Sequence, residues 1–434
     1  MKKDFEFLAN IQSMIEKPEY FRFLANRGKN FDSNKDWVYY SGPYWNHLEI
    51  EAAITTLIEG KWLSSGENVM KFERRFSKLF NFTDSLMVNS GSSANLVMIA
   101  ALKKYYGWED GDEIIVSVVG FPTTINPIVQ NGLRPIFVDI SWNDLNWDLE
   151  EIRKAINPRT RAVFSSPVLG NMYNLDDLNE ILGDTKIKII SDNCDSLGSK
   201  WRGLYLTDYS VAASCSFYPA HHITTMEGGM VSSANEDIVK IARSLAWWGR
   251  ACYCVGVQNL LTDGTCKRRF SRWIEDCEVE VDHKYVFENI GYNLKPLDLQ
   301  GSIGLVQLDK LPEIEDLRKR NKANLDAIFS QISAVRTIEQ LPQAETSWFG
   351  VPIVCESLSQ KRRLVSHLER NRIQTRNYFA GNILQQPAYR HLGDYKKYPK
   401  ATDVLSKVFF VGCSPTINND MINYIDTVVK KFTS

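Results

Sequence analysis

Short apolar runs alternate with amphipathic stretches between about residues 60 and 240. The β-rich runs are DEIIVSVV, RPIFVDI, TRAVFSS, IKIISDN, VAASCSF and GGMVSS. Stretches with helical spacing, such as DLEEIRKAI and NLDDLNEIL, separate them. This alternation predicts an α/β fold with a largely parallel sheet, because parallel neighbours are usually joined through a helix.

A second pattern begins near residue 309. Helical LPEIEDLRKRNKANLDAIFSQI is followed by the strand-like WFGVPIVC, the helical SQKRRLVSHLERN and a C-terminal helix. We expect three parts: an N-terminal extension over 1–58, which could cover an edge of an active site, a large domain over 59–308, and a smaller C-terminal α+β domain over 309–434.

Polar residues follow several of the predicted strands, and in open parallel sheets ligands gather at the carboxyl ends of the strands. In NSGSSANLVMIAALKKYYG, Ser92 or Ser93 would cap a helix whose start could bind a phosphate; simple capping is the alternative. Asp192, at the tip of IKIIS, could hold a heterocyclic nitrogen protonated, or could merely form a turn or cap. Ser216, at the end of VAASCS, could add a second phosphate contact.

Composition narrows the class of protein. The chain has 434 residues, 44% of them apolar, which suffices for a large core, and a formal charge of -1. This balance gives no attraction to nucleic acid or to an anionic membrane. Asp4 and Glu6 fall where a signal peptide needs an apolar run, and no apolar run approaches the ~20 residues of a membrane helix. We therefore expect a soluble cytoplasmic enzyme.

The eight cysteines do not indicate a disulfide framework in a chain without a secretion signal. Cys215, Cys355 and Cys413 lie in apolar surroundings and are expected to be buried thiols. The other five are Cys194, Cys252, Cys254, Cys266 and Cys277. Their spacing needs an explanation other than burial or a disulfide framework; a structural zinc site, which four cysteines also suit, is one alternative.

Five motifs in order carry a resemblance to a known family. GSSAN, FPTTINPIVQNGLRPIFVDI, SDNCDSLGS, SFYPAHHITTMEGG and IGYNLKPLDLQGSIGLVQLDKL resemble the nucleotide-sugar aminotransferases of the DegT/DnrJ/EryC/StrS family, which are fold-type I vitamin B6 enzymes. The resemblance extends from about residue 36 to the C-terminus and implies that pyridoxal phosphate or pyridoxamine phosphate is the cofactor. The cofactor-binding residues that it implies are Ser92, Ser93, Phe121, Asp192, Ser216 and Asn293.

Two of these assignments bear on assembly and stacking. Phe121 would stack on the pyridine ring, although a core phenylalanine is an alternative. Asn293 matches an asparagine that reaches the cofactor phosphate of the partner subunit, which implies a homodimer. TRNYFAGN, residues 375–382, resembles the wall of the sugar-nucleotide site.

His221 stands where the family has the lysine that binds the cofactor covalently. Imidazole cannot form that stable bond, but it can act as a general base near neutral pH. The change resembles that of the sugar 3-dehydrases, which use pyridoxamine phosphate to remove the C3 hydroxyl of a nucleotide-linked 4-keto-6-deoxy sugar. Asp195 and Tyr218 also resemble the dehydrase pattern, so His221, Asp192, Asp195 and Tyr218 form the expected catalytic set. His222 is expected to be structural, and an inactive member of the family is the alternative.

The cysteine spacing separates two kinds of 3-dehydrase. Fifty-seven residues lie between Cys194 and Cys252, as in the kind that carries a [2Fe-2S] cluster and receives electrons from an NADH-dependent flavin and iron-sulfur reductase. The resemblance therefore implies Cys194, Cys252, Cys254 and Cys266 as cluster ligands. It also implies CDP-4-keto-6-deoxyglucose as the substrate, in 3,6-dideoxysugar and lipopolysaccharide O-antigen biosynthesis. A cluster-free dehydratase of GDP- or TDP-linked sugars is the alternative.

The chain departs from the family pattern at three places. Eleven residues separate Cys254 from Cys266, which is a longer gap than the resemblance predicts, and this leaves Cys277 as a reserve ligand. Met226 stands where the family usually has glycine before EGG, and Ser191 stands where an acidic residue often precedes the aspartate. The changes at Met226 and Ser191 concern local geometry and leave the expected reaction unchanged.

Overall fold

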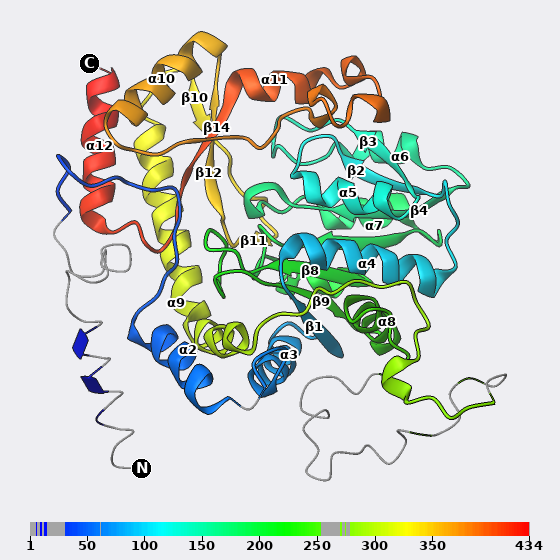
Figure 1. Cartoon of the computed structure of the whole chain (residues 1–434). Helices are drawn as coiled ribbons and strands as arrows, with labels where there is room; N and C mark the ends of the chain where they lie inside the picture. The colour runs from blue at the N-terminus through cyan, green and yellow to red at the C-terminus, as the bar shows by residue number, and fades with distance from the viewer. Residues whose placement is uncertain are drawn as a thin grey trace.

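The computed structural model describes residues 31–60, 62–252 and 278–433, with a few isolated positions before residue 31 and between 252 and 278. Within this part of the chain, a seven-stranded sheet with helices on both faces forms the large domain, and a smaller four-stranded sheet lies beside it (Figure 1). The fold is the predicted α/β arrangement with a C-terminal α+β domain.

The large sheet has the order β1-β9-β8-β5-β4-β2-β3. Its strands are β1 Asp84–Val88, β2 Glu113–Ser117, β3 Arg134–Val138, β4 Thr160–Ser165, β5 Lys188–Asp192, β8 Ala212–Ser216 and β9 Gly229–Ser233. The five strands from β8 to β3 are parallel, as predicted, but β9 runs antiparallel to both β8 and β1. No helix separates β8 from β9, so the chain turns back directly and the second strand reverses direction.

Side chains of the large sheet alternate between two apolar layers. Ile114 and Val116 pack in one core cluster, whereas Ile115 packs in another, because successive strand residues point to opposite faces. Both faces are therefore buried, which explains the nearly continuous apolar runs in the sequence. The helices of this domain are α3 Glu67–Leu79, α4 Gly91–Tyr106, α5 Pro122–Gln130, α6 Leu149–Ala155, α7 Leu175–Leu182 and α8 Glu236–Ala246.

The N-cap of helix α4 lies two residues before Ser92, the first of the two predicted caps. Ser90 is the N-cap, and its side chain accepts a hydrogen bond from the Ser93 N–H at 3.1 Å. The prediction that Ser92 or Ser93 caps the helix was therefore wrong: both residues lie in the first turn. Gly107 ends the helix in the left-handed conformation, φ 66°, which glycine adopts without strain.

The small domain is built on an antiparallel sheet of order β10-β12-β14-β13. Its elements are β10 Val335–Thr337, β12 Gly350–Cys355, α10 Leu358–Arg370, β13 Arg376–Asn377, α11 Pro399–Lys407, β14 Val408–Gly412 and α12 Asn419–Thr433. Helix α9, Asp298–Phe329, precedes it and contains the expected domain boundary at 308/309. A third sheet, β11-β6-β7, pairs Ala344–Glu345 with Lys200–Trp201, which in turn pairs with Leu204–Tyr205.

The described N-terminal residues pack against both domains. Helix α2, His47–Glu59, is fixed to α9 by a buried ion pair between Glu49 and Lys310 at 2.5 Å. Upstream of α2, Val38 pairs with Ile373 of the small domain. In the part of the chain that the structure describes, no helix is long and apolar enough to cross a membrane.

Candidate active site

A cavity of about 470 Å³ lies where the carboxyl ends of the parallel strands face the small domain. Eight of the residues predicted for the site line it: Ser92, Phe121, Asp192, Cys194, Asp195, Ser216, Tyr218 and His221. These residues are far apart in the sequence, and the strand ends bring them together. The cavity thus brings together most of the residues that the sequence predicted for the site.

Other predicted residues lie elsewhere or are not described. Ser93 does not line the cavity, because its hydroxyl donates to Asn89 Oδ1 at 2.7 Å and contacts Ser90. Asn293 is exposed and hydrogen-bonded to Lys295, outside the cavity of its own chain. Cys252 is buried and also does not line the cavity. Of the other cysteines, Cys254, Cys266 and Cys277 lie outside the described residues.

One end of the cavity suits a phosphate group. The start of α4 approaches the end of β8 so closely that a Cβ on Gly91 would lie 2.5 Å from the Cβ of Ser216. Only glycine fits there, and the N–H groups of a first helical turn have no partners within the helix. The Ser216 hydroxyl accepts a hydrogen bond from the Tyr218 N–H at 3.3 Å and lines the same end as Ser92. The helix dipole and these donors favour an anion.

Asp192 lies at the tip of β5 with its carboxylate almost fully buried. Its Oδ2 accepts hydrogen bonds from Asn95 Nδ2 at 2.9 Å and from the Thr124 hydroxyl at 2.6 Å. Its Oδ1 accepts a longer bond from the Cys194 N–H at 3.3 Å. All three donors are neutral. A buried carboxylate whose donors among the described residues are neutral is a suitable partner for a cationic group on a ligand.

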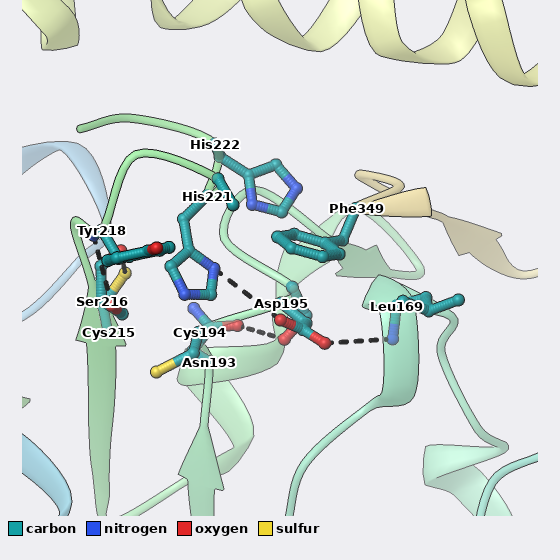
Figure 2. A network of polar contacts seen from close by, with 12 residues as sticks. Leu169, Asn193, Cys194, Asp195, Cys215, Ser216, Tyr218, His221, His222 and Phe349 are labelled. Atoms are coloured by element: carbon teal, nitrogen blue, oxygen red, sulfur yellow. Dashed lines mark hydrogen bonds and ion pairs between the residues drawn. The ribbon is translucent and has the colours of Figure 1, made fainter. Parts of the chain in front are cut away.

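His221 projects from the connection between β8 and β9 toward Asp195 (Figure 2). The distance from His221 Nδ1 to Asp195 Oδ1 is 3.7 Å, and the other carboxylate oxygen accepts a hydrogen bond from the Leu169 N–H at 3.3 Å. Burial, helped by the charge of Arg318, lowers the pKa of His221 to about 4. Burial, helped by the charge of Asp192, raises the pKa of Asp195 to about 7. Near neutral pH the imidazole is therefore neutral and able to accept a proton.

A buried guanidinium fixes the backbone beside His221. Arg318, from α9, donates to the carbonyl of His221 at 3.1 Å and to those of Trp348 and Phe349 at 3.1 and 3.2 Å. The carbonyl of Ala220 accepts from the same guanidinium at 3.5 Å. One side chain thus ties the histidine to the segment that leads into β12.

Two further contacts hold the same loop. His222 Nε2 lies 2.9 Å from the carbonyl of Ser347, and burial holds the pKa of His222 well below its usual value. The Ser41 hydroxyl donates to the carbonyl of Ala220 at 2.8 Å. His222 does not line the cavity, so its place agrees with the structural role expected from the sequence.

The small domain closes the cavity with residues that sequence reasoning missed. Phe349 and Phe410 come from segments beside β12 and within β14, and no local motif distinguishes them from core phenylalanines. Tyr40 comes from the N-terminal segment, which was expected to cover an edge of the site. Arg376 and Asn377 belong to the stretch TRNYFAGN, so the resemblance had indicated their region.

The residues present fit a pyridoxal or pyridoxamine phosphate. The described part of the cavity offers an anion-binding end, a buried carboxylate, and a buried His221 Nδ1 that has no hydrogen-bond partner within the described residues. No lysine stands among the described lining residues. A cofactor here would be held by hydrogen bonds and stacking rather than by a covalent bond to the protein.

The fold and these groups define a fold-type I vitamin B6 enzyme. The chain belongs to the DegT/DnrJ/EryC1/StrS aminotransferase family, whose model matches residues 46–431.

Three known proteins show where the chain stands within this family. It is 37% identical over 395 residues to a dTDP-4-dehydro-2,6-dideoxy-D-glucose 3-dehydratase of Saccharopolyspora spinosa, covering 89% of this chain and 83% of that one. It is 33% identical to the lipopolysaccharide biosynthesis protein RfbH of Salmonella typhimurium, covering 90% and 91%. The solved structure of E. coli GDP-4-keto-6-deoxy-D-mannose-3-dehydratase with bound hydrated PLP has a TM-score of 0.77 and 31% identity, covering 91% and 99%. Its relatives thus include sugar-nucleotide 3-dehydratases.

Proposed function

We propose that the chain removes the C3 hydroxyl of a nucleotide-linked 4-keto-6-deoxyhexose, using pyridoxamine phosphate. The observation that carries this proposal is the placement of His221 in the same cavity as Asp192, with no lysine among the described lining residues. An aminotransferase of this family needs the lysine, whereas a dehydratase needs only a base. The 3-dehydratase names of two relatives support the same reaction type.

Each protein group has a separate task. Bound pyridoxamine phosphate would supply an amine for the C4 ketone of the sugar and a ring that accepts electron density. Asp192 would keep the proton on the ring nitrogen, since a buried carboxylate stabilises a cation beside it. His221 would accept a proton from the C4′ carbon of the cofactor, because its imidazole is neutral near pH 7.

Asp195 and Tyr218 complete the proposed catalytic set. Asp195 lies 3.7 Å from His221 Nδ1, so it orients the imidazole and stabilises it once it has gained a proton. The protonated His221 can then return that proton to the leaving hydroxyl. Tyr218 and Phe121 are half-exposed at the cavity rim, where a bound cofactor and sugar would cover both rings.

His221→Asn tests the assigned base. The variant should still bind pyridoxamine phosphate, but exchange of the C4′ proton of the cofactor with D₂O, followed by proton NMR, should fall by at least about a hundredfold. His391→Asn, at an exposed position outside the cavity, is the matched control and should exchange at the wild-type rate. Undiminished exchange in His221→Asn would exclude the proposed role.

The nucleotide is proposed to be CDP, from the resemblance of the sequence to the cluster-bearing dehydratases. The printed names of two relatives specify dTDP and GDP for those proteins, and the Salmonella relative is named for lipopolysaccharide biosynthesis. Turnover of CDP-, dTDP- and GDP-linked 4-keto-6-deoxy sugars should be compared at equal concentration. If the dTDP- or the GDP-linked sugar gave the largest kcat/KM, that nucleotide would replace CDP as the proposed one.

We also propose that Cys194, Cys252, Cys254 and Cys266 hold a [2Fe-2S] cluster, supplied with electrons by an NADH-dependent flavin and iron-sulfur reductase. The spacing of the four cysteines supports this, as does the place of Cys194 in the cavity wall beside Asp192. Cys194 forms no disulfide with another described cysteine. Within the described residues alone, no three potential ligands gather to bind a metal, and two of the four cysteines lie outside that part of the chain.

Electron paramagnetic resonance tests the cluster directly. Protein purified without oxygen and reduced with dithionite should give a [2Fe-2S] signal that Cys252→Ser abolishes, while Cys355→Ser, at a buried thiol of the small domain, leaves it unchanged. A silent spectrum in iron-poor protein would instead support a cluster-free dehydratase. That second candidate is favoured by the structural likeness to GDP-4-keto-6-deoxy-D-mannose-3-dehydratase.

A homodimer is the proposed assembly. Asn293 is exposed and does not line the cavity of its own chain, as expected for a residue that serves the site of a second copy. The side chain contacts Lys295, which lies over the exposed ring of Trp248. In a dimer these residues would bring a positive charge and an amide to the partner's cofactor phosphate.

A further inference from the structure

Two polar side chains from separate helices hold the buried carboxylate of Asp192. Asn95 lies in α4 and Thr124 in α5, and both donate to the same oxygen, Oδ2, at 2.9 and 2.6 Å. All three side chains are at most 4% exposed. Hydrogen bonds to a charged group in a buried site are strong, and their directions fix the plane of the carboxylate.

The amide of Asn95 is itself held in one orientation. Its Oδ1 accepts a hydrogen bond from the Ser214 hydroxyl at 2.5 Å, and its second N–H donates to the carbonyl of Thr123 at 3.0 Å. Reversing the amide would place its oxygen against the carboxylate of Asp192. The amide would then lose its hydrogen bonds to Asp192, to Ser214 and to the carbonyl of Thr123. The network from β8 through α4 therefore presents a donor to Asp192 in one way only.

The consequence concerns the other carboxylate oxygen. Oδ2 accepts two short hydrogen bonds, whereas the bond that Oδ1 accepts from the Cys194 N–H is longer, at 3.3 Å. We propose that Asn95 and Thr124 are positioning residues that hold Oδ2 so that Oδ1 is free to accept the ring N–H of the cofactor. Neither Asn95 nor Thr124 lines the cavity, so both would act through Asp192. This inference rests on the proposed use of a pyridoxamine phosphate.

Thr124→Val is the most direct test, because it removes the hydroxyl donor and keeps the branched shape. With pyridoxamine 5′-phosphate labelled with ¹⁵N in the ring, the bound ¹⁵N shift should move toward that of neutral pyridine. C4′ proton exchange at saturating cofactor should slow by roughly tenfold. Thr124→Ser keeps the donor and should restore both values.

Two further variants make the test specific. Thr207→Val makes the same change at a buried threonine whose hydroxyl has no partner within the described residues and does not line the cavity, so neither readout should move. Ser214→Ala removes the hydrogen bond that holds the Asn95 amide and leaves the side-chain donors of Asp192 in place. It should shift both readouts in the same direction as Thr124→Val, by a smaller amount, even if Thr124→Val fails to fold.

The inference is overturned if Thr124→Val and Ser214→Ala both match Thr207→Val in ring ¹⁵N shift and exchange rate. A wild-type protein that binds the cofactor but shows no C4′ exchange would contradict the proposed function instead. In that case the ¹⁵N shifts of the variants would still decide whether Asn95 and Thr124 position the carboxylate.

Discussion

Met226 occupies a backbone conformation that side chains rarely adopt. Its φ is 73°, in the left-handed region where glycine is favoured, and the residue lies in the connection that carries His221. The resemblance to the family predicts glycine at this position, and the left-handed backbone is the physical reason for that preference. A strained residue next to a functional group persists only when its surroundings fix it.

Met226→Gly should therefore stabilise the protein by about 1 kcal/mol, through relief of the left-handed strain. The added flexibility of glycine in the unfolded chain offsets part of this gain. Chemical denaturation monitored by fluorescence would measure it. Met226→Ala, which keeps the Cβ and so the strain, should not be stabilised, and a gain of equal size in both variants would point to the methionine side chain instead.

The low pKa of His221 has a consequence for pH dependence. Burial lowers this pKa from 6.5 to about 4. The neutral base form of His221 therefore persists at pH values at which an exposed histidine would already be protonated. This base form should remain from pH 8 to about pH 5, and a change in C4′ proton exchange near pH 7 would follow Asp195, whose pKa is about 7. In Asp195→Asn, exchange should stay nearly constant down to about pH 5, and a decline centred near pH 6.5 would show that the imidazole is not buried as described.

The lowered pKa of His221 also makes the stability of the fold depend on pH. Between pH 6.5 and 4 the unfolded chain binds a proton at His221 that the folded chain does not, so this residue makes the fold less stable as the pH falls. His221→Asn removes that contribution. The variant should lose less stability than the wild type between pH 6.5 and 4.

At the scale of elements, the contact between the start of α4 and the end of β8 sets the phosphate-binding end. A Cβ on Gly91 would lie 2.5 Å from Ser216 Cβ and 2.9 Å from its hydroxyl, so Gly91→Ala must push the two elements apart. We expect pyridoxamine phosphate to bind at least about tenfold more weakly, measured by calorimetry. Gly42→Ala, where the nearest atom is at 3.8 Å, is the control and should bind normally.

The elements differed in how far the sequence predicted them. The strands of the sheet interior were predicted because burial on both faces makes continuous apolar runs. β1, DSLMV, was missed: it has only three consecutive apolar residues, and among the described residues it is an edge strand that pairs with β9 alone. The direction of β9 could not be predicted from the sequence alone. A short connection gives an antiparallel pair only if the two strands are neighbours in the sheet, and the sequence does not show that β8 and β9 are neighbours.

The site was predictable where a residue follows a strand. Asp192, Ser216 and His221 come directly after or shortly beyond apolar runs, so the carboxyl-end rule locates them. Phe349 and Phe410 enter the cavity from the small domain through long-range packing, for which the local sequence carries no signal. The roles of Asn95 and Thr124 depend on distances between two helices and a strand, which likewise only the structure provides.

At the scale of the whole molecule, the proposed dimer predicts complementation between subunits. His221→Asn disables the base of its own cavity but keeps Asn293, whereas Asn293→Ala keeps its own base. A mixed dimer would contain one site with an intact His221 and an intact Asn293 from the partner. Each mixed dimer should therefore have about half of the wild-type activity, since one site of two is complete. After random exchange in an equimolar mixture about half of the dimers are mixed, so the sample should regain roughly a quarter of the wild-type activity.

Mass measurement by light scattering must show subunit exchange in the mixed sample. If Asn293 served its own chain, mixing would restore nothing, because neither subunit would contain a complete site. Restoration without a dimer in solution would contradict the assembly and leave the role of Asn293 unexplained.

The direct connection between β8 and β9 also has an evolutionary meaning. His221, His222 and Tyr218 all lie on this connection, whereas Asp192 and Gly91 come from other strand ends. A mutation confined to one short stretch of the gene can thus exchange the proton-transferring side chain and leave the cofactor-binding groups untouched. Such an architecture lets a lineage acquire a new reaction without first rebuilding its ligand site.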